Sequence, residues 1–222
     1  MIIDAHCHVA RGEARHFVCE PFSGEARAGD VVFYGTHPWE YLNWDGGGRL
    51  REALKSNPSS GVGEIGLDRL KERDIPAAMR EAFVQQLEIA SEFRRPVVLH
   101  GAKCWGEVMK ACAPYVGSIP SFLFHGFSRS GGLLPEIERI NGFVSVGGAV
   151  MNDHAVNYRK LVREMPAELL LLESDASAEN KDELPPIGEI LVKVAQLRGV
   201  EPMELERVIS ENAQRFLGAK IF

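Results

Sequence analysis

The chain has 222 residues, 45% of them hydrophobic and 25% charged, so it is long enough to bury one substantial core. Its 25 Lys and Arg residues against 31 Asp and Glu give a net charge of −6, which excludes a general electrostatic attraction to nucleic acid or to anionic membranes. No apolar run approaches the roughly 18 residues that a membrane-spanning helix needs. We expect a single cytoplasmic domain over residues 1–222, with no membrane contact and no obligate protein partner.

Short apolar runs recur along the chain with helical segments between many of them, the pattern of βα units and a mainly parallel sheet. Eight runs are predicted to be strands: Ile2 to Cys7, His16 to Cys19, Val31 to Tyr34, Val62 to Ile65, Val97 to His100, Phe122 to His125, Phe143 to Val146, and Leu169 to Glu173. Six segments are predicted to be helices: Ala77 to Phe93, Lys103 to Tyr115, Leu133 to Ile140, Asn157 to Glu164, Ile187 to Arg198, and Met203 to Phe216. Segments 46–48, 56–61 and 180–186 are predicted to be loops.

Eight strands with intervening helices predict an α/β fold, a distorted (β/α)₈ barrel. Only about eight residues join the first two predicted strands, fewer than the dozen or more that a full crossover helix needs. We therefore expect the barrel to be irregular near its first two strands.

The first predicted strand ends in the sequence Asp4-Ala5-His6-Cys7-His8. Side chains alternate between the faces of a strand, so His6 and His8 point together while Cys7 points away. Two imidazoles can then bind one ion. A single His-x-His pair in an apolar strand is more often packed in the core, so a metal site needs support from other strands.

That support comes from four further strand ends, which carry Glu64, His100, His125 and, two residues beyond Glu173, Asp175. In a barrel these carboxyl ends meet at one face, where the active sites of this fold lie. As separate core residues, each would need its own polar partner in a dry interior, whereas one metal centre accounts for all of them. The predicted metal ligands are therefore His6, His8, Glu64, His100, His125 and Asp175.

Four imidazoles and two carboxylates suit one or two divalent ions such as zinc, manganese or iron, and tolerate magnesium at lower affinity. Glu64 is the group expected between two ions, because a carboxylate has two oxygens to share. Asp68, on the same segment, is expected to brace the loop that follows.

The ordered segments of this chain resemble those of TatD-related hydrolases (TatD-like DNases), a branch of the metal-dependent amidohydrolase superfamily. They are DAHCH, GTHPWE, GEIGLD, VVLH, FHGFS, VSVGG, LLESDAS and ENAQRFLG. The resemblance covers nearly the whole chain and implies a distorted TIM barrel with a one- or two-metal centre that hydrolyses phosphodiester bonds, typically in DNA. Other amidohydrolases often bridge their metals with a carboxylated lysine, and the presence of Glu64 at that point favours the TatD branch.

Carried over by position, His6, His8 and Asp175 resemble the ligands of one metal, and His100 and His125 those of the other, with Glu64 between them. The implied mechanism is metal activation of water. Asp175 is the expected catalytic residue, since it can ligate metal and also accept the proton of the water.

Other residues near the strand ends have two open interpretations each. Glu173 either orients a histidine ligand or packs in the core. His37 resembles a family position near the substrate, where it would donate to a phosphate oxygen, but it can also cap its own turn. Lys103 and Arg129 follow His100 and His125 by three and four residues, so they either bind a substrate anion or are solvated.

His16 and His154 have no partner pattern and are expected to be structural or exposed. The four cysteines form no CxxC pair and are expected to be free thiols: Cys7, Cys19, Cys104 and Cys112.

The chain departs from the family pattern around the expected active site. Ala102 stands where relatives commonly carry arginine, Ser177 stands where proline often follows, and segment 179–183 is acidic where relatives are often basic. These changes weaken the inference of a long nucleic-acid substrate, whose binding depends on several Lys or Arg contacts.

The leading hypothesis is a phosphodiesterase acting on DNA ends or short nucleotides. The alternatives are a hydrolase of another small ester or amide and, less favoured because Glu64 and Asp175 are present, a catalytically silent metal-binding barrel.

Overall fold

The computed structural model describes residues 1–20, 27–128 and 131–218. Eight parallel strands form one sheet in sequence order. They are β1 (Ile3–Cys7), β2 (Arg15–Glu20), β3 (Val31–Tyr34), β4 (Gly61–Asp68), β5 (Val97–Ala102), β6 (Phe122–Phe124), β7 (Gly142–Val146) and β8 (Leu170–Leu172). All eight predicted strands are confirmed; β3 has the predicted bounds, and the other seven differ from the prediction at one or both ends.

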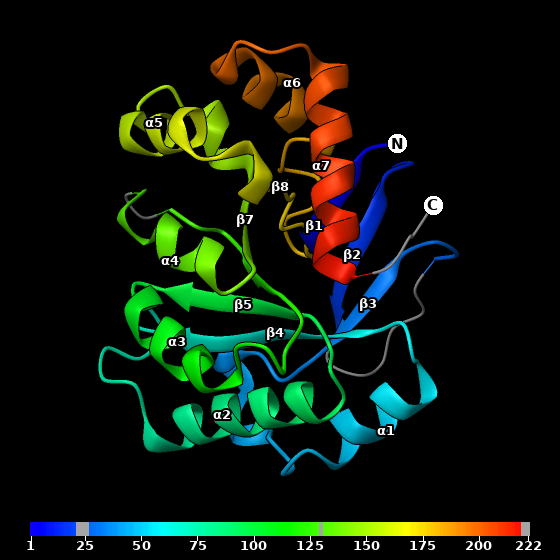
Figure 1. Ribbon diagram of the computed structural model, residues 1–222, viewed down its shortest axis with the longest axis vertical. Coiled ribbons are helices and arrows are strands. Elements are labelled where there is room, and N and C mark those ends of the chain that lie inside the picture. Colours follow the sequence, from blue (N-terminus) through cyan, green and yellow to red (C-terminus); the bar gives the residue numbers. More distant parts are fainter. Residues whose placement is uncertain (21–26, 129–130, 219–222) are drawn as a thin grey trace.

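The sheet curls until the chain after β8 lies beside β1. The backbone N–H of Asp175 donates to the carbonyl of His6 at 3.1 Å, and that of His8 donates to Ala176 at 2.8 Å. The side chain of Asp4 adds to this seam, because its carboxylate accepts from the backbone N–H and hydroxyl of Ser174. The result is a nearly closed barrel with helices around it, as predicted (Figure 1).

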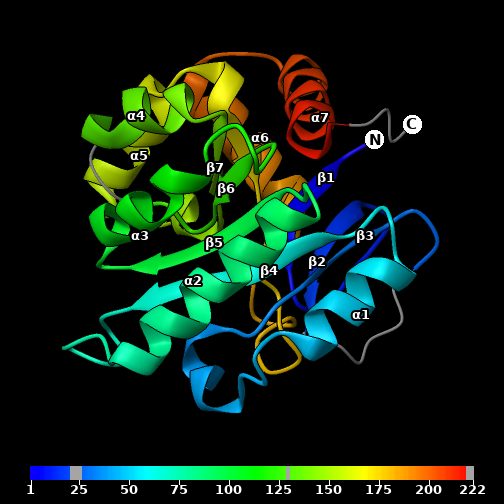
Figure 2. The same ribbon diagram turned by 60° about the horizontal axis from the view of Figure 1, so that its bottom comes forward.

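The α-helices are α1 (Gly48–Ser56), α2 (Ala77–Glu92), α3 (Trp105–Cys112), α4 (Leu134–Arg139), α5 (Val156–Glu164), α6 (Ile187–Arg198) and α7 (Pro202–Leu217). Short 3₁₀ segments are η1 (Pro38–Asn43), η2 (Ala113–Tyr115), η3 (Gly131–Leu133), η4 (Gly148–Met151) and η5 (Ala167–Leu169). In Figure 2, α2 crosses over β4 and α1 lies beside β3. The six predicted helices are present, but α1 was not predicted, since only Leu50 and Leu54 anchor it in the core.

The predicted irregularity lies where it was expected. The loop from residue 8 to residue 14 joins β1 to β2 without a helix, and the pairing of these strands shifts register between Asp4 and Cys7. Buried His16 supports the connection, with Nδ1 3.0 Å from Asp30 Oδ1 and Nε2 2.9 Å from the carbonyl of Arg11. His16 is thus structural, and His154 is exposed.

The interior at the amino-terminal end of the barrel is filled by phenylalanines. Phe216 of α7 lies 5.8 Å, centroid to centroid, from each of Phe17, Phe33 and Phe143. These three residues come from β2, β3 and β7. The last helix therefore ties distant strands together by apolar burial.

The described cysteines and helices agree with the expectations from sequence. All four cysteines are buried free thiols. Within the described ranges, none of the helices has the length and apolar character needed to cross a membrane.

Candidate metal centre

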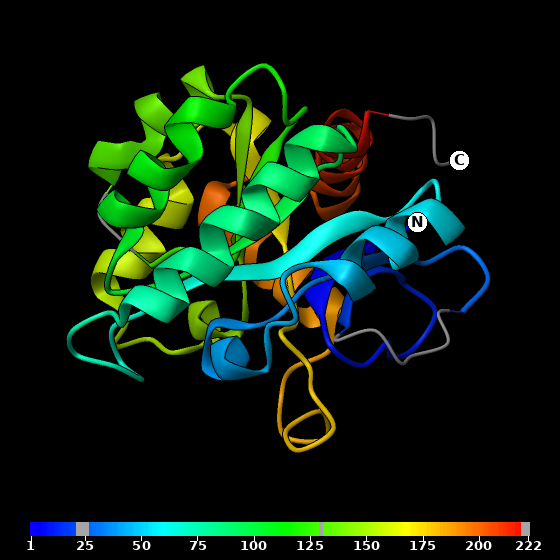
Figure 3. The same cartoon turned by 90° about the horizontal axis from the view of Figure 1, so that it is seen from below.

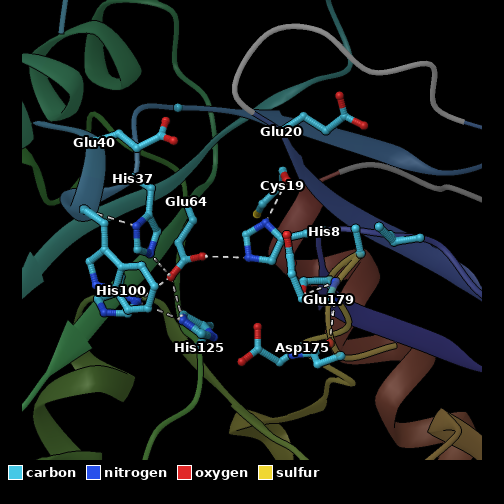
Figure 4. A pocket seen from close by; sticks show the side chains of 16 residues that line it. His8, Cys19, Glu20, His37, Glu40, Glu64, His100, His125, Asp175 and Glu179 are labelled. Atoms are coloured by element: carbon cyan, nitrogen blue, oxygen red, sulfur yellow. Dashed lines mark hydrogen bonds and ion pairs between the residues drawn. The ribbon is translucent and has the colours of Figure 1, made fainter. Parts of the chain in front are cut away.

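The six predicted ligands meet at the carboxyl end of the barrel. His6 belongs to β1 and His8 follows it, Glu64 lies on β4, His100 on β5, and His125 and Asp175 follow β6 and β8. All but the fully buried His6 line a cavity of about 720 Å³ (Figure 4). Parallel strands deliver their ends to one face, which is why residues so far apart in sequence converge.

Glu64 occupies the middle of this cluster, with imidazoles around both of its oxygens (Figure 4). Oε2 lies 3.3 Å from Nε2 of His6 and 3.4 Å from Nε2 of His8. Oε1 lies 2.5 Å from Nδ1 of His100 and 2.7 Å from Nε2 of His125. The carboxylate thus divides the imidazoles into two pairs, as a group between two ions would.

Close packing of β4 against β5 places Glu64 and His100 side by side. Gly66 has a φ of +154°, and a Cβ added there would lie 2.0 Å from the carbonyl oxygen of His100. A side chain at this position would push the two strands apart, so glycine is required for the approach.

Asp175 faces the same cluster from the opposite side of the cavity. Its Oδ1 lies 3.3 Å from Nε2 of His6, and 53% of its side chain is exposed. Burial acts to raise the pKa of this carboxyl, but its close contact with the His6 ring and the charges of His6 and His125 hold the pKa below its ordinary value. Asp175 is therefore anionic and within reach of water.

His8 and His100 have one nitrogen turned outward to a group that can only accept a hydrogen bond. Nδ1 of His8 donates to the carbonyl of Cys19 at 3.1 Å, and Nε2 of His100 donates to Asp68 Oδ2 at 2.9 Å. Once the inner nitrogen of each ring is deprotonated, its lone pair is available to a cation. This is the tautomer of metal-ligating histidines, whose other nitrogen donates to a carboxylate or carbonyl.

Glu173 faces the outer nitrogen of His125 in an ion-pair contact, although this nitrogen makes no hydrogen bond. Oε2 of Glu173 lies 3.5 Å from Nδ1 of His125. The Glu173 carboxylate also accepts from the backbone N–H of Gly126 at 2.8 Å and from the hydroxyl of Ser145 at 2.5 Å. These contacts favour an orienting role for Glu173 over simple packing.

His6 supplies the strongest indication that the cluster fits a cation. Its ring is fully buried, with Nδ1 3.4 Å from Sγ of Cys19, and Nε2 has no hydrogen-bond partner. An unpaired buried nitrogen is costly, and a cation between the imidazoles and carboxylates would satisfy it. Three groups of donors have spacings that suit an ion: His6, His8 and Glu64; His6, His125 and Asp175; and His37, Glu64 and His100.

Protons and a cation would compete for these ligands. Burial works to raise the pKa of Glu64, but the neighbouring His125, His6 and His100 hold it well below its ordinary value. Burial works to lower the pKa of His125, but the Glu64 carboxylate outweighs it and the pKa rises to about 10. Metal binding must displace these imidazole protons and is therefore pH-dependent.

His37 differs from the other imidazoles of the cavity. Its Nδ1 accepts the backbone N–H of Trp39 at 3.1 Å, so the neutral ring carries its hydrogen on Nε2. That nitrogen lies 3.5 Å from Oε1 of Glu64. His37 thus caps its own turn, and it also presents a donor to the cavity.

Of the two predicted cationic contacts, only Lys103 belongs to the part of the chain that the structure describes. Lys103 is exposed just after β5 and does not line it, and Arg129 lies outside the described residues. Among the lining residues that the structure describes there is no Lys or Arg, whereas Glu20, Glu40 and Glu179 stand around the mouth (Figure 4). Figure 3 shows η1 and the segment after β8 projecting at the same end of the barrel.

Asp68 has a larger role than the loop brace that was predicted. It accepts from the backbone N–H groups of Leu70 and Lys71, which is the bracing role, and it also holds His100 and the indole of Trp39. Alternation along β4 puts residues 64 and 68 on one face, and this signal could have identified the second role. Cys19 beside His6 had no comparable signal.

The comparisons with known proteins agree with this geometry. A family model described as TatD related DNase matches residues 24–218. The chain is 29% identical over 195 residues to the 3'-5' ssDNA/RNA exonuclease TatD of Cronobacter sakazakii, covering 82% of this chain and 74% of that protein. It is 28% identical over 195 residues to the protein of the same name from Dickeya dadantii, with the same coverage.

Two solved structures share the fold. The TatD homologue YJJV from Escherichia coli superposes with a TM-score of 0.79 at 19% identity, over 99% of this chain and 98% of that one. A TatD family hydrolase from Entamoeba histolytica gives a TM-score of 0.73 at 13% identity, over 97% of both chains.

Proposed function

The chain belongs to the family of TatD related DNases, and from this premise we propose that it is a divalent-metal-dependent phosphodiesterase acting on DNA ends or short nucleotides. The observation that carries the proposal is Glu64, whose two oxygens each face a separate pair of imidazoles. The curated relatives described above are named as exonucleases of single-stranded DNA and RNA, which supports the same chemistry.

We assign His6, His8 and Asp175 to one cation and His100 and His125 to a second, with Glu64 shared. The donor set favours zinc, manganese or iron over magnesium. A cation bound there supplies Lewis-acid polarisation of the phosphate and lowers the pKa of water. The unpaired Nε2 of His6 fits such a group.

The residues of the chain then divide the remaining tasks. Asp175 accepts the proton of the attacking water, since its carboxylate is ionised and faces the cavity. Glu173 and Asp68 hold His125 and His100 in orientation. His37 donates its Nε2–H to a phosphate oxygen, because its other nitrogen already accepts from Trp39.

The acidic mouth indicates which substrates enter. Glu20, Glu40 and Glu179 repel a duplex, whose phosphates lie every few ångströms along each strand, over a distance comparable to the Debye length of roughly 8 Å at physiological salt. A flexible end can enter without bringing the rest of the polyanion close. We therefore expect single-stranded ends and small phosphodiesters to be cleaved faster than internal positions of a duplex.

The test pairs metal analysis of the purified protein with kinetics on a nicked circular duplex, a single-stranded oligonucleotide and a small aryl phosphodiester. The expected result is one or two equivalents of divalent metal and preference for the last two substrates. Faster internal cleavage of the duplex across ordinary salt concentrations would overturn the proposal that the acidic mouth excludes duplex DNA. A metal-loaded protein inactive on all three would overturn the phosphodiesterase.

A second candidate is hydrolysis of another small ester or amide by the same centre. It is favoured by the described lining of the cavity, which offers no cationic side chain to a polyanion. Adding carboxylic ester and amide substrates to the same panel distinguishes this hydrolase from the phosphodiesterase. A protein that binds metal but hydrolyses none of these substrates would support the catalytically silent barrel.

A further inference from the structure

Trp39 is a large aromatic residue that is fixed in place and yet open to solvent. It lies on η1 at the cavity, with 57% of its surface exposed. Its indole N–H donates to Oδ2 of Asp68 at 2.7 Å, and its ring meets His37 edge to face with centroids 5.2 Å apart. The orientation of the indole is therefore set before any ligand arrives, which lowers the entropic cost of stacking against it.

The other two tryptophans of the chain do not share this situation. Trp105 is buried and packs against Phe124 and Phe127. Trp44 is half-buried and donates its indole N–H to Gln85 at 2.6 Å. Trp39 is the one tryptophan that lines the described cavity.

The indole lies one side chain away from the proposed reaction centre. The His37 ring that it contacts is itself 4.9 Å from the His100 ring, and Nε2 of His37 lies 3.5 Å from Glu64. A base placed against the indole would therefore belong to the same nucleotide as the phosphate at the centre, or to an adjacent one.

The ammonium of Lys71 lies over the Trp39 ring, and the backbone of Lys71 is held by the same carboxylate. Its Nζ lies 5.8 Å from the centroid of the Trp39 ring, and its backbone N–H donates to Oδ1 of Asp68 at 2.8 Å. An aromatic face next to an ammonium matches a nucleotide, which has a flat base and an anionic phosphate.

We propose that Trp39 and Lys71 form a nucleotide subsite, in which the indole stacks on an unpaired base and the ammonium binds the phosphate next along the strand. The inference rests on the proposed function and deepens it by naming the two residues that hold a nucleotide next to the reaction centre. Stacking acts on an uncharged base, so the carboxylates at the mouth do not oppose it. A base inside a duplex already stacks on both faces and is not available to the indole.

The first test measures binding without turnover. Chelator-treated protein is titrated with single-stranded pentathymidylate and with an abasic strand of the same length, while tryptophan fluorescence is recorded. We expect pentathymidylate to quench the emission and the abasic strand to quench far less. The quenching should persist in Trp44→Phe and disappear in Trp39→Phe. Equal quenching by both strands, or by neither, would overturn the subsite.

The second test uses the metal-loaded enzyme. Trp39→Ala should raise KM for the single-stranded oligonucleotide about tenfold, with a smaller penalty on a strand lacking the terminal base, and Trp39→Phe should retain part of the affinity. Lys71→Ala should lower the slope of log KM against log salt by about 0.7, the value for one phosphate contact on a single strand. Lys110→Ala, an exposed lysine on α3, serves as the matched control.

The outcomes separate the two proposals. If Trp39→Ala cleaves oligonucleotides with an unchanged KM, the subsite proposal is wrong and the phosphodiesterase proposal stands. If the quenching depends on the base but no phosphodiester is cleaved, the nucleotide subsite stands and the phosphodiesterase proposal is wrong.

Discussion

The two ends of the barrel both bury side chains but are held together by different forces. At the amino-terminal end, Phe17, Phe33, Phe143 and Phe216 are at most 2% exposed, and the first three rings each lie 5.8 Å, centroid to centroid, from the Phe216 ring. At the carboxyl end, His6, Glu64 and His125 are at most 8% exposed, whereas 53% of the Asp175 side chain is exposed. Apolar burial stabilises the first end directly, whereas the second buries groups that carry charge and must be paired.

The difference teaches that one set of strands serves two purposes. Strand β2 contributes Phe17 to the apolar end and Cys19, which lies beside His6, to the polar end. A buried charged cluster adds little to stability by itself and is retained for chemistry. Substitutions at the two ends should therefore separate folding from catalysis.

The largest effect is expected from Asp175→Asn. In the proposed mechanism the amide removes an anionic ligand and the group that accepts a proton from water, so turnover should fall by roughly three orders of magnitude or more. Because the side chain is half-exposed and contacts no apolar core residue among the described interactions, the thermal unfolding midpoint should change little. Steady-state kinetics and calorimetry check both statements, and near-normal turnover would contradict the role.

At the opposite end, Phe216→Ala should cost about 3–5 kcal/mol of the free energy of unfolding, because it leaves a cavity among three other rings. The folded fraction should bind metal as the wild type does. Phe216→Leu, which preserves more of the volume, is the control. Urea unfolding measures the cost, and weaker metal binding without lost stability would break the comparison between the two ends.

Glu64→Gln should reduce metal occupancy at one or both positions, since an amide is a poorer bridging ligand than a carboxylate. The apparent Kd for Zn²⁺ should rise by more than the roughly 10- to 100-fold typical of a residue that only orients a ligand. Titration with a chromophoric chelator measures it. Unchanged stoichiometry and affinity would show that Glu64 is not shared between ions.

The smallest of these effects is expected from Glu173→Gln. Its carboxylate orients His125 without contacting the reacting groups, so metal affinity should weaken about 10- to 100-fold. Glu179→Gln makes the same chemical change at the exposed mouth and should leave metal affinity unchanged. Equal affinities in the two variants would reduce Glu173 to a packing residue.

Much of the site was predictable because its residues mark strand ends. His6 and His8 follow from alternation on one strand, and Glu64, His100, His125 and Asp175 follow from the convergence of parallel strands. Helix α1 escaped prediction because Gly46 and Gly47 precede it, Gly48 begins it, and few apolar residues line it. The roles of Lys103 and Arg129 stay predictions.

The sequence by itself determined the strands, their parallel order and the gathering of histidines and carboxylates at one end, because each depends on local periodicity or on the rule that parallel strand ends share an edge. Only the tertiary structure decided which nitrogen of each imidazole faces the cavity and which aromatic ring stays open. Those outcomes depend on hydrogen bonds between distant residues, such as Asp68 with Trp39 and His100, separated by 29 and 32 positions. No local pattern encodes such pairs, since they form only when the closed barrel brings separate strands and loops together.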